Sequence, residues 1–310
     1  MTLFSLIVAL LLEQLRPLPV ARFVQAPLKL FARFLEDRFN DGESRHGAVA
    51  WWVAILAACF GAALFYFVLW HVSPLLGVLF NVLILYLTMG FRQVSHFFTD
   101  IQLALRMGEV PRARQILGEW RGRRHDDSSS SEVARLAIEE ALIASHRNVF
   151  GVAFWFIILP GPSGAILYRL ARFLDEEWGR QRRLDPDFGA FGDFPSRAFA
   201  VLDWLPVRMT AAAFSVVGDF EDGVYCWRAQ ANQWKDKASG ILLASGGGAL
   251  GVRLGMPIHE SGDVVERPEM GVGDEADADF MQSTIGLIWR TLVLVMLLLA
   301  LLGIAGWVGN

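Results

Sequence analysis

The sequence predicts an all-α, polytopic integral membrane protein that forms a single membrane domain over residues 1–310. Of these residues, 54% are hydrophobic and only 19% are charged, whereas soluble domains carry about 25% charged residues. Two uncharged stretches are long enough to cross a bilayer, which takes about 20 residues per helix. No strand pattern is sustained enough to build a sheet, so we expect helices throughout.

The amino-terminal part predicts a helix, a cytoplasmic segment and then a transmembrane hairpin. Within residues 1–46, the apolar run 2–12 is short for a bilayer span and predicts an interfacial or short spanning helix. Residues 47–91 are uncharged apart from His71, and Ser73 and Pro74 follow it directly. That length fits two spans joined by a very tight turn near His71.

Residues 92–147 predict a cytoplasmic helical loop. Gly108 to Pro111 marks a break between two short helices. The stretch 123–131, RRHDDSSSS, has no apolar residue and predicts a flexible loop. Ser131, followed by Glu132 and an apolar helical run, predicts the amino-terminal cap of the next helix.

Residues 148–220 predict broken or re-entrant helices with charges at membrane depth. Pro160 to Gly164 interrupts an apolar stretch near its middle, which favours a segment that dips into the membrane and returns. Farther along, Asp203 and Arg208 lie in an apolar run with Pro206 between them. Intramembrane charges need partners, so this pair either forms a site or pins two helices together.

The carboxyl-terminal third predicts a cytoplasmic glycine-rich segment, 221–285, and a last transmembrane helix, 286–309. The run Ser245 to Gly251 contains Gly247 and Gly248. It either wraps a phosphate through backbone N–H groups or packs helices tightly, and the missing Lys and Ser/Thr of a phosphate loop favour packing. Residues 262–279 predict an extended acidic linker.

Basic residues predict the orientation and location. Lys and Arg are frequent in 13–46, 92–147 and 169–197 and absent from the hairpin tip. We therefore expect a protein of the bacterial inner membrane with its polar loops on the cytoplasmic side. A net charge of −4 gives no reason to expect nucleic acid. The lipid bilayer is the first expected partner.

Acidic residues offer a candidate metal site. Asp175 and Glu176 begin a run of three carboxylates after the predicted broken helix and could hold Mg²⁺, although such runs are more often solvated helix faces. Glu139 lies on the helix that enters the membrane, and the same two readings apply to it.

Several motifs in order resemble the CobD/CbiB family. They are Pro162-x-Gly164 with Tyr168-Arg169, Leu174-Asp175 with Gly179, Leu205-Pro206-x-Arg208, Ala249-Leu-Gly-Val-Arg-Leu-Gly255, and Val265-Glu266-Arg267-Pro268. The resemblance implies an inner-membrane enzyme of late cobalamin biosynthesis. It would join aminopropanol or its phosphate to adenosylcobyric acid through an amide bond, with ATP and Mg²⁺.

Site roles follow from the same resemblance. It implies Glu139, Arg169 and Asp175 as catalytic residues, Asp175 and Glu176 as metal ligands, and a corrinoid substrate. The substrate-binding residues would be Asp203, Arg208, Gly247, Gly248 and Arg253.

Departures from the family pattern keep other functions open. Family enzymes carry Arg-Asp-Thr before the Glu139 helix, where this chain has Arg121-Gly-Arg-Arg-His-Asp-Asp. A catalytically degenerate site is therefore one alternative. A second is a non-catalytic sensor linked to β-lactamase induction, because Leu202-Asp203-Trp-Leu-Pro-Val-Arg208 resembles the AmpE branch. A third is a membrane scaffold, and a homo-oligomer or a partner membrane protein stays open in each case.

Overall fold

The computed structural model of the chain describes residues 2–15, 26–184 and 188–308. Arg16 and Arg22, which support the predicted orientation, lie outside the described residues. The chain divides into two compact units: unit 1 holds Met1–Gly90 and Gly151–Leu205, and unit 2 holds Phe91–Phe150 and Pro206–Asn310.

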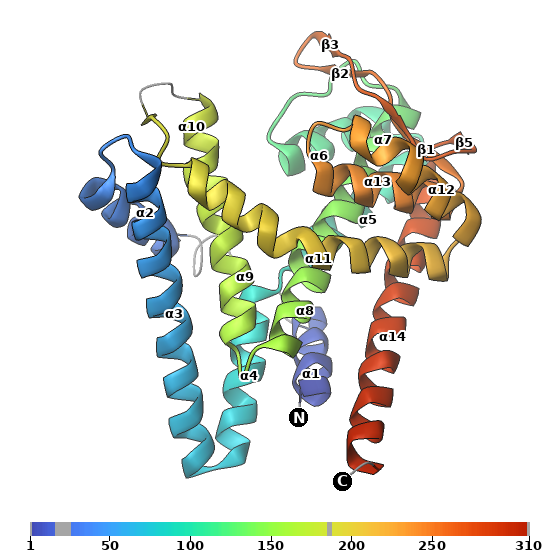
Figure 1. Cartoon of the computed structure of the whole chain (residues 1–310). Helices are drawn as coiled ribbons and strands as arrows, with labels where there is room; N and C mark the ends of the chain where they lie inside the picture. The colour runs from blue at the N-terminus through green and yellow to red at the C-terminus, as the bar shows by residue number, and fades with distance from the viewer. Residues whose placement is uncertain (1, 16–25, 185–187, 309–310) are drawn as a thin grey trace. The chain divides into compact units, whose positions relative to one another are not determined.

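Unit 1 is helical throughout its described residues (Figure 1). Its elements are α1 (Thr2–Leu15), α2 (Ala26–Phe39), α3 (Ser44–Val72), α4 (Pro74–Thr88), α8 (Gly151–Ile158), α9 (Ser163–Leu174), the π-helical turn η3 (Asp175–Gly179), α10 (Arg180–Leu184) and the first half of α11 (Asp193–Val217).

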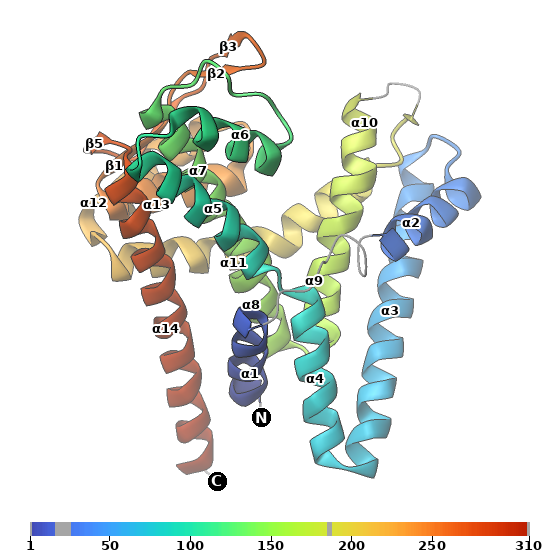
Figure 2. The same ribbon diagram turned by 180° about the vertical axis from the view of Figure 1, so that it is seen from behind.

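The predicted tight turn between two helices is confirmed as the connection of α3 and α4 (Figure 2), and that both helices cross the membrane stays a prediction. Ser73 is the single residue between them, and its extended backbone ends one helix and begins the next. Pro74 occupies the first turn of α4, where a missing N–H costs nothing and the fixed φ favours the helix. A one-residue connection therefore reverses the chain.

The break at Pro160 is also confirmed. α8 ends at Ile158, and Gly161 adopts a positive φ of 60° in the turn that leads into α9. Gly164 then packs against the backbone carbonyl of Trp155, where a side chain would collide. Close approach of α8 and α9 thus requires glycine at this position, and the depth of the turn in a membrane stays a prediction.

Unit 2 combines helices with small sheets. Its helices are α5 (Phe91–Arg106), α6 (Val110–Arg121), α7 (Ser130–Ser145), the π-helical turn η2 (His146–Phe150), the second half of α11, α12 (Phe220–Gln230), the 3₁₀ turn η5 (Ala231–Gln233), α13 (Lys237–Leu250) and α14 (Ala278–Val308).

Two helix boundaries in unit 2 test the sequence reasoning. The predicted break after Gly108 is confirmed, because α5 ends at Arg106 and α6 begins at Val110. The predicted cap was wrong by two residues: Ser129, not Ser131, accepts the N–H of Glu132 at the start of α7. A run of four serines offers several equivalent caps, and tertiary contacts select one.

The expectation that no sheet forms was wrong. β1 (Val252–Gly255) pairs antiparallel with β4 (Glu269–Met270) and parallel with β5 (Asp274–Glu275). β2 (Ile258–Glu260) and β3 (Asp263–Val265) form a hairpin. Its two turn residues, Ser261 and Gly262, both have positive φ, as the turn of a tight hairpin requires. The expected acidic linker is therefore partly paired.

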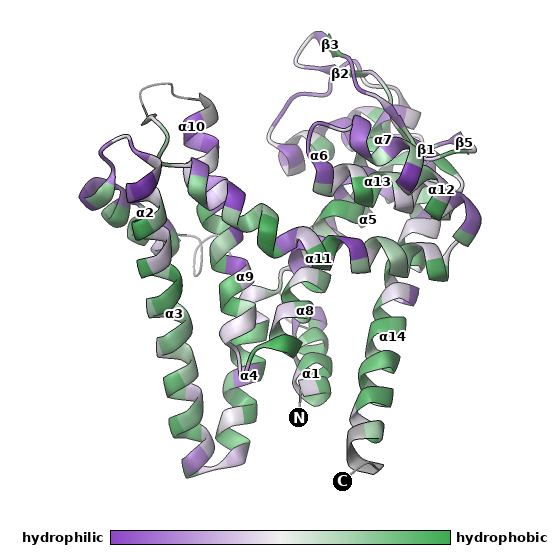
Figure 3. Cartoon of the chain, viewed as in Figure 1, coloured by the Kyte–Doolittle hydropathy of each residue, from purple (hydrophilic) through white to green (hydrophobic). Residues whose placement is uncertain are grey.

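The all-α polytopic class is confirmed. Among the described residues, four helical stretches are long and apolar enough to cross a membrane: Ser44–Val72, Ser130–Ile158, Asp193–Val217 and Ala278–Ala305. α4 is apolar but shorter. Figure 3 shows hydrophobic residues along most of α3 and α14. Such surfaces match a lipid environment, because lipid replaces the water that a soluble protein would meet.

Candidate functional site

One face of α7 holds the strand-rich segment of unit 2 in place. Glu132, Arg135 and Glu139 are spaced three and four residues apart, so they lie on one side of the helix. All three side chains are buried and bond to residues 255–267. The spacing is visible in the sequence, but nothing local in it shows what these charges contact.

Glu139 forms the central ion pair. Arg267 donates to both of its carboxylate oxygens, over 2.8 Å to Oε2 and 3.1 Å to Oε1, and the Gly255 N–H donates to Oε1 over 2.8 Å. The Arg267 guanidinium also lies over the Trp234 ring, 5.2 Å from its centroid. Both oxygens of Glu139 are thus occupied, which makes it a positioning residue in this arrangement.

Glu132 fixes the β2–β3 hairpin. Its Oε1 accepts the His259 N–H over 2.6 Å and the Ser128 hydroxyl over 2.9 Å. Its Oε2 lies 3.1 Å from Nδ1 of His259. If Nδ1 carries the proton, Nε2 of this half-exposed imidazole keeps a free lone pair. Arg135 adds a bond to the carbonyl of Pro257, over 2.8 Å.

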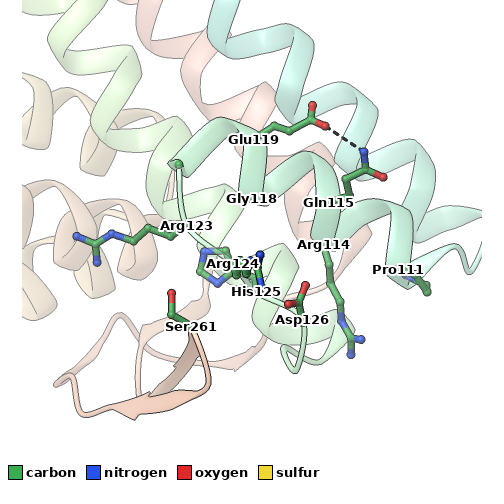
Figure 4. A pocket seen from close by; sticks show the side chains of 11 residues that line it. Pro111, Arg114, Gln115, Gly118, Glu119, Arg123, Arg124, His125, Asp126 and Ser261 are labelled. Atoms are coloured by element: carbon green, nitrogen blue, oxygen red, sulfur yellow. Dashed lines mark hydrogen bonds between the residues drawn. The ribbon is translucent and has the colours of Figure 1, made fainter.

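An open groove of about 840 Å³ lies between α6 and the loop 122–128 (Figure 4). Its lining carries three arginines, Arg114, Arg123 and Arg124, and two carboxylates, Glu119 and Asp126. Arg123 pairs with the buried Glu260, and the Nε of Arg114 donates to the carbonyl of Ser128 over 2.6 Å. Arg124 lines this groove and also an adjoining cavity of about 220 Å³ beside His259.

Two further groups shape the groove. Figure 4 shows Glu119 and Gln115 bonded to one another on the side of α6 away from Arg124 and Asp126. His125 is buried in the loop, and this burial, together with the positive charge of Arg121, holds the pKa of its imidazole below the ordinary value. Because His125 is neutral, the arginines carry the positive charge of the groove lining. Their forked guanidinium groups match phosphate and carboxylate oxygens.

The predicted residues of unit 1 form separate contacts. Asp175 accepts the Ser196 hydroxyl over 2.6 Å, and Glu176 pairs with Arg172 over 2.7 Å. Glu177 lies 3.5 Å from Lys29. The three carboxylates therefore face different partners, and no cluster of metal-ligating side chains occurs among the described residues. The arrangement does not fit the Mg²⁺ site predicted on Asp175 and Glu176.

Asp203 accepts a buried hydrogen bond in unit 1. Its Oδ1 accepts the Tyr168 hydroxyl over 2.8 Å, and both side chains are buried. α11 continues through Pro206, so Asp203 and Arg208 lie five residues apart on one helix, about 140° apart around its axis. They therefore point to different sides of α11. Arg169 directly follows Tyr168 on α9.

Gly247 and Gly248 lie inside α13, so their N–H groups serve the helix. A side chain at Gly248 would strike the backbone carbonyl of Asp222 on α12, and one at Gly247 would meet Gly271. This geometry is helix packing and not a phosphate loop. Arg253, on β1, lies 3.8 Å from Glu275 in an exposed pair. Of the predicted site residues in unit 2, Glu139 belongs to the α7 network. Arg253 lies on β1, two residues before Gly255, whose N–H donates to Glu139.

The buried pair generates a stability prediction. Arg267→Met leaves the Glu139 carboxylate buried without its counter-charge, which costs about 3–5 kcal/mol, whereas the double change Glu139→Leu with Arg267→Met should be less destabilising. Arg253→Met, at the exposed pair, is the control and should cost less than about 1 kcal/mol. Thermal unfolding of the purified protein in detergent measures all three. A double variant less stable than Arg267→Met would contradict this view of the pair.

Comparison with known proteins assigns the chain to a family. It matches the family described as CobD/Cbib protein over residues 6–288. It is 33% identical to "Cobalamin biosynthesis protein CobD" of Stutzerimonas stutzeri over 98% of this chain and 97% of that protein. It is 36% identical to the protein of that name in Chromobacterium violaceum, over 64% of this chain and 63% of that one.

A more distant relative agrees. The chain is 25% identical to "Cobalamin biosynthesis protein CbiB" of Salmonella typhimurium over 89% of each chain. No solved structure matches the chain. Because the family match and the Stutzerimonas relative both extend over nearly the whole length, the chain belongs to the CobD/CbiB family.

Proposed function

We propose that this protein acts in cobalamin biosynthesis, by joining aminopropanol or its phosphate to a carboxylate of adenosylcobyric acid. The observation that carries the proposal is the 33% identity to a cobalamin biosynthesis protein over 98% of the chain. The arginines that line the groove of unit 2 support it, because ATP, the corrinoid carboxylate and aminopropanol phosphate all carry phosphate or carboxylate oxygens. Its volume of about 840 Å³ is in the range of ligand-binding sites.

The chemistry has two steps. A carboxylate oxygen of the corrinoid attacks the terminal phosphorus of ATP, and ADP leaves with the electrons of the broken P–O bond. The amine nitrogen then attacks the acyl carbon, and inorganic phosphate leaves as the amide forms. ATP is a substrate here and would bring Mg²⁺ on its phosphates.

Arg114 and Arg124 are placed to bind phosphate oxygens in this reaction. Arg124 lines both the groove and the smaller cavity, so it is the guanidinium available to an anion in either; Asp126 and Asp127 also line the cavity. Charge-assisted bonds of this kind hold and orient anions without proton transfer. Their contribution is to align the reacting atoms and to offset charge that develops on the transferred group.

His259 is placed to take a proton. An amine attacks only after its ammonium form is deprotonated, so the second step needs a base close to the anion site. His259 lines the cavity beside Arg124, and Glu132 holds its Nδ1. A carboxylate in this position orients an imidazole and stabilises its protonated form. Nε2 would then accept the ammonium proton.

The first experiment tests the activity itself. A strain that lacks its own CobD/CbiB enzyme and is given cobyric acid should recover cobalamin-dependent growth when it expresses this chain. Membranes from that strain should convert adenosylcobyric acid to the amide product only when ATP and the aminopropanol substrate are added, which chromatography measures. Correctly inserted protein that gives neither growth nor product would exclude the ligation and leave a non-catalytic role.

Arg124→Ala tests the groove. Loss of one charge-assisted anion contact should raise KM for the phosphate-bearing substrate about 10-fold, or about 1.4 kcal/mol. Arg112→Ala is the matched control, because Arg112 is an exposed arginine on α6 that pairs with Glu109 and does not line the groove. Equal kinetic constants for the two variants would remove the groove from the substrate path.

His259→Asn tests the base. The asparagine amide can still donate to Glu132 from the position of Nδ1, but it has no counterpart of Nε2. We expect kcat to fall at least about 100-fold with little change in KM. A variant that retains wild-type kcat across the pH range would show that His259 serves only to hold the hairpin.

A further inference from the structure

Helix α2 presents an apolar face that no other described part of unit 1 covers. It buries only Ala32 and Leu35 completely, as it packs against α3. Leu30 and Phe34 are 70% and 63% exposed, and Phe31 is also exposed. Exposure of one leucine and two phenylalanine side chains to water is unfavourable, because burial of apolar surface contributes about 25 cal/mol per Å².

The exposed residues lie on one side of α2. At about 100° per residue, positions 30, 31 and 34 occupy one arc that adjoins the face packed on α3. Lys29, Arg33 and Glu36 occupy a separate arc. Asp37 lies at the edge of the apolar arc, about 20° from Leu30, and Arg38, in the last turn, lies within it, where its long stem can extend toward water. The helix therefore has a packed face, an apolar face and a charged face.

The orientation of α2 is fixed by its connections. Asn40 to Glu43 turn the chain from α2 into α3, with Gly42 at a positive φ of 79°. The Gly42 N–H donates to Oδ1 of Asn40, and the Gly42 carbonyl accepts the N–H of Ala190 over 2.8 Å. At its other end, Lys29 lies 3.5 Å from Glu177 of η3. Figures 1 and 2 show α2 lying across the end of α3.

The neighbouring surface of α3 indicates what covers the apolar face. Arg45 and His46 begin this helix, and exposed apolar residues follow from Val49, with Trp52 half exposed. α3 is a candidate membrane span, and tryptophan is typical of the boundary between headgroups and acyl chains. α2 packs against the same helix, so its apolar face continues a surface that already requires lipid.

We propose that α2 is a membrane-surface helix whose Leu30, Phe31 and Phe34 insert into the lipid headgroup–acyl boundary. The charged face then remains in water, as in other interfacial amphipathic helices. This inference is independent of the reaction proposed above, because it depends only on contacts of unit 1.

Environment-sensitive labels test the proposal. In full-length protein with Cys59→Ala and Cys226→Ala, a fluorophore is attached at Phe34→Cys or, as the matched control, at the neighbouring Arg33→Cys. The protein is placed singly in phosphatidylcholine nanodiscs. We expect a nitroxide near the top of the lipid acyl chains to quench the label at position 34 at least about 3-fold more than the label at 33, and aqueous iodide to show the reverse preference.

Two outcomes would overturn the proposal. Equal iodide quenching at both positions, with no quenching by the lipid nitroxide, would place the apolar face in water. Protection of position 34 from both quenchers would show that protein covers it. Phe31→Cys provides a second apolar position, so a variant at Phe34 that fails to fold does not leave the proposal untested.

Discussion

The buried ion pair between Glu139 and Arg267 is the constraint on which the site of unit 2 depends. Ionised groups lose several kcal/mol of hydration when they are buried, and only good geometry with further hydrogen bonds offsets that loss. Here Arg267 donates to both carboxylate oxygens and to the carbonyl of Gly255, over 2.9 Å. Every part of the pair is satisfied, so it fixes β1 and the following residues against α7 in one register.

The hairpin beyond that pair has little core of its own. All three residues of β3 are exposed, so burial of apolar surface cannot hold it. Polar contacts do so instead: Glu132 binds His259, Arg123 binds Glu260, and the Ser261 N–H donates to the carbonyl of Arg124. The same contacts that place the hairpin therefore build the groove wall, and structure and site share one network.

Much of the helical architecture was predictable because its causes are local. Uncharged length, Pro74 and the Pro160–Gly164 break act within a few residues, and the structure confirms the two turns they predict. The β2–β3 hairpin had a local signal as well, Ser261-Gly262, but three-residue strands show too little alternation to be recognised. Gly248 packs against α12, as the helix-packing interpretation of the glycine-rich run predicted in preference to a phosphate loop.

The candidate site was less predictable because its contacts join distant segments. Glu132, Arg135 and Glu139 have helical spacing, yet their partners come more than 100 positions later in the chain. The stretch 123–131 was predicted to be a flexible loop, and its contacts with Glu260 and Ser261 show that part of it forms a wall of the groove. The hydrogen bond from Tyr168 to Asp203 joins residues 35 positions apart, and nothing local in the sequence indicates it.

Departures from the family pattern can be weighed against this network. They are spread along the chain: Arg-Asp-Thr is replaced by a segment with three arginines in residues 121–127, and further departures lie at Ile143-Ala144 with Arg147, at Arg172-Phe173 and at residues 237–240. The segment 121–127 lines the groove, but the frame of the site rests on Glu139 and Arg267, which retain the family motif and bind one another. Because breaking a buried pair is strongly destabilising, stability alone requires that Glu139 and Arg267 be kept together. The change at residues 121–127 therefore alters the charge on the groove wall and leaves the pair that supports it intact.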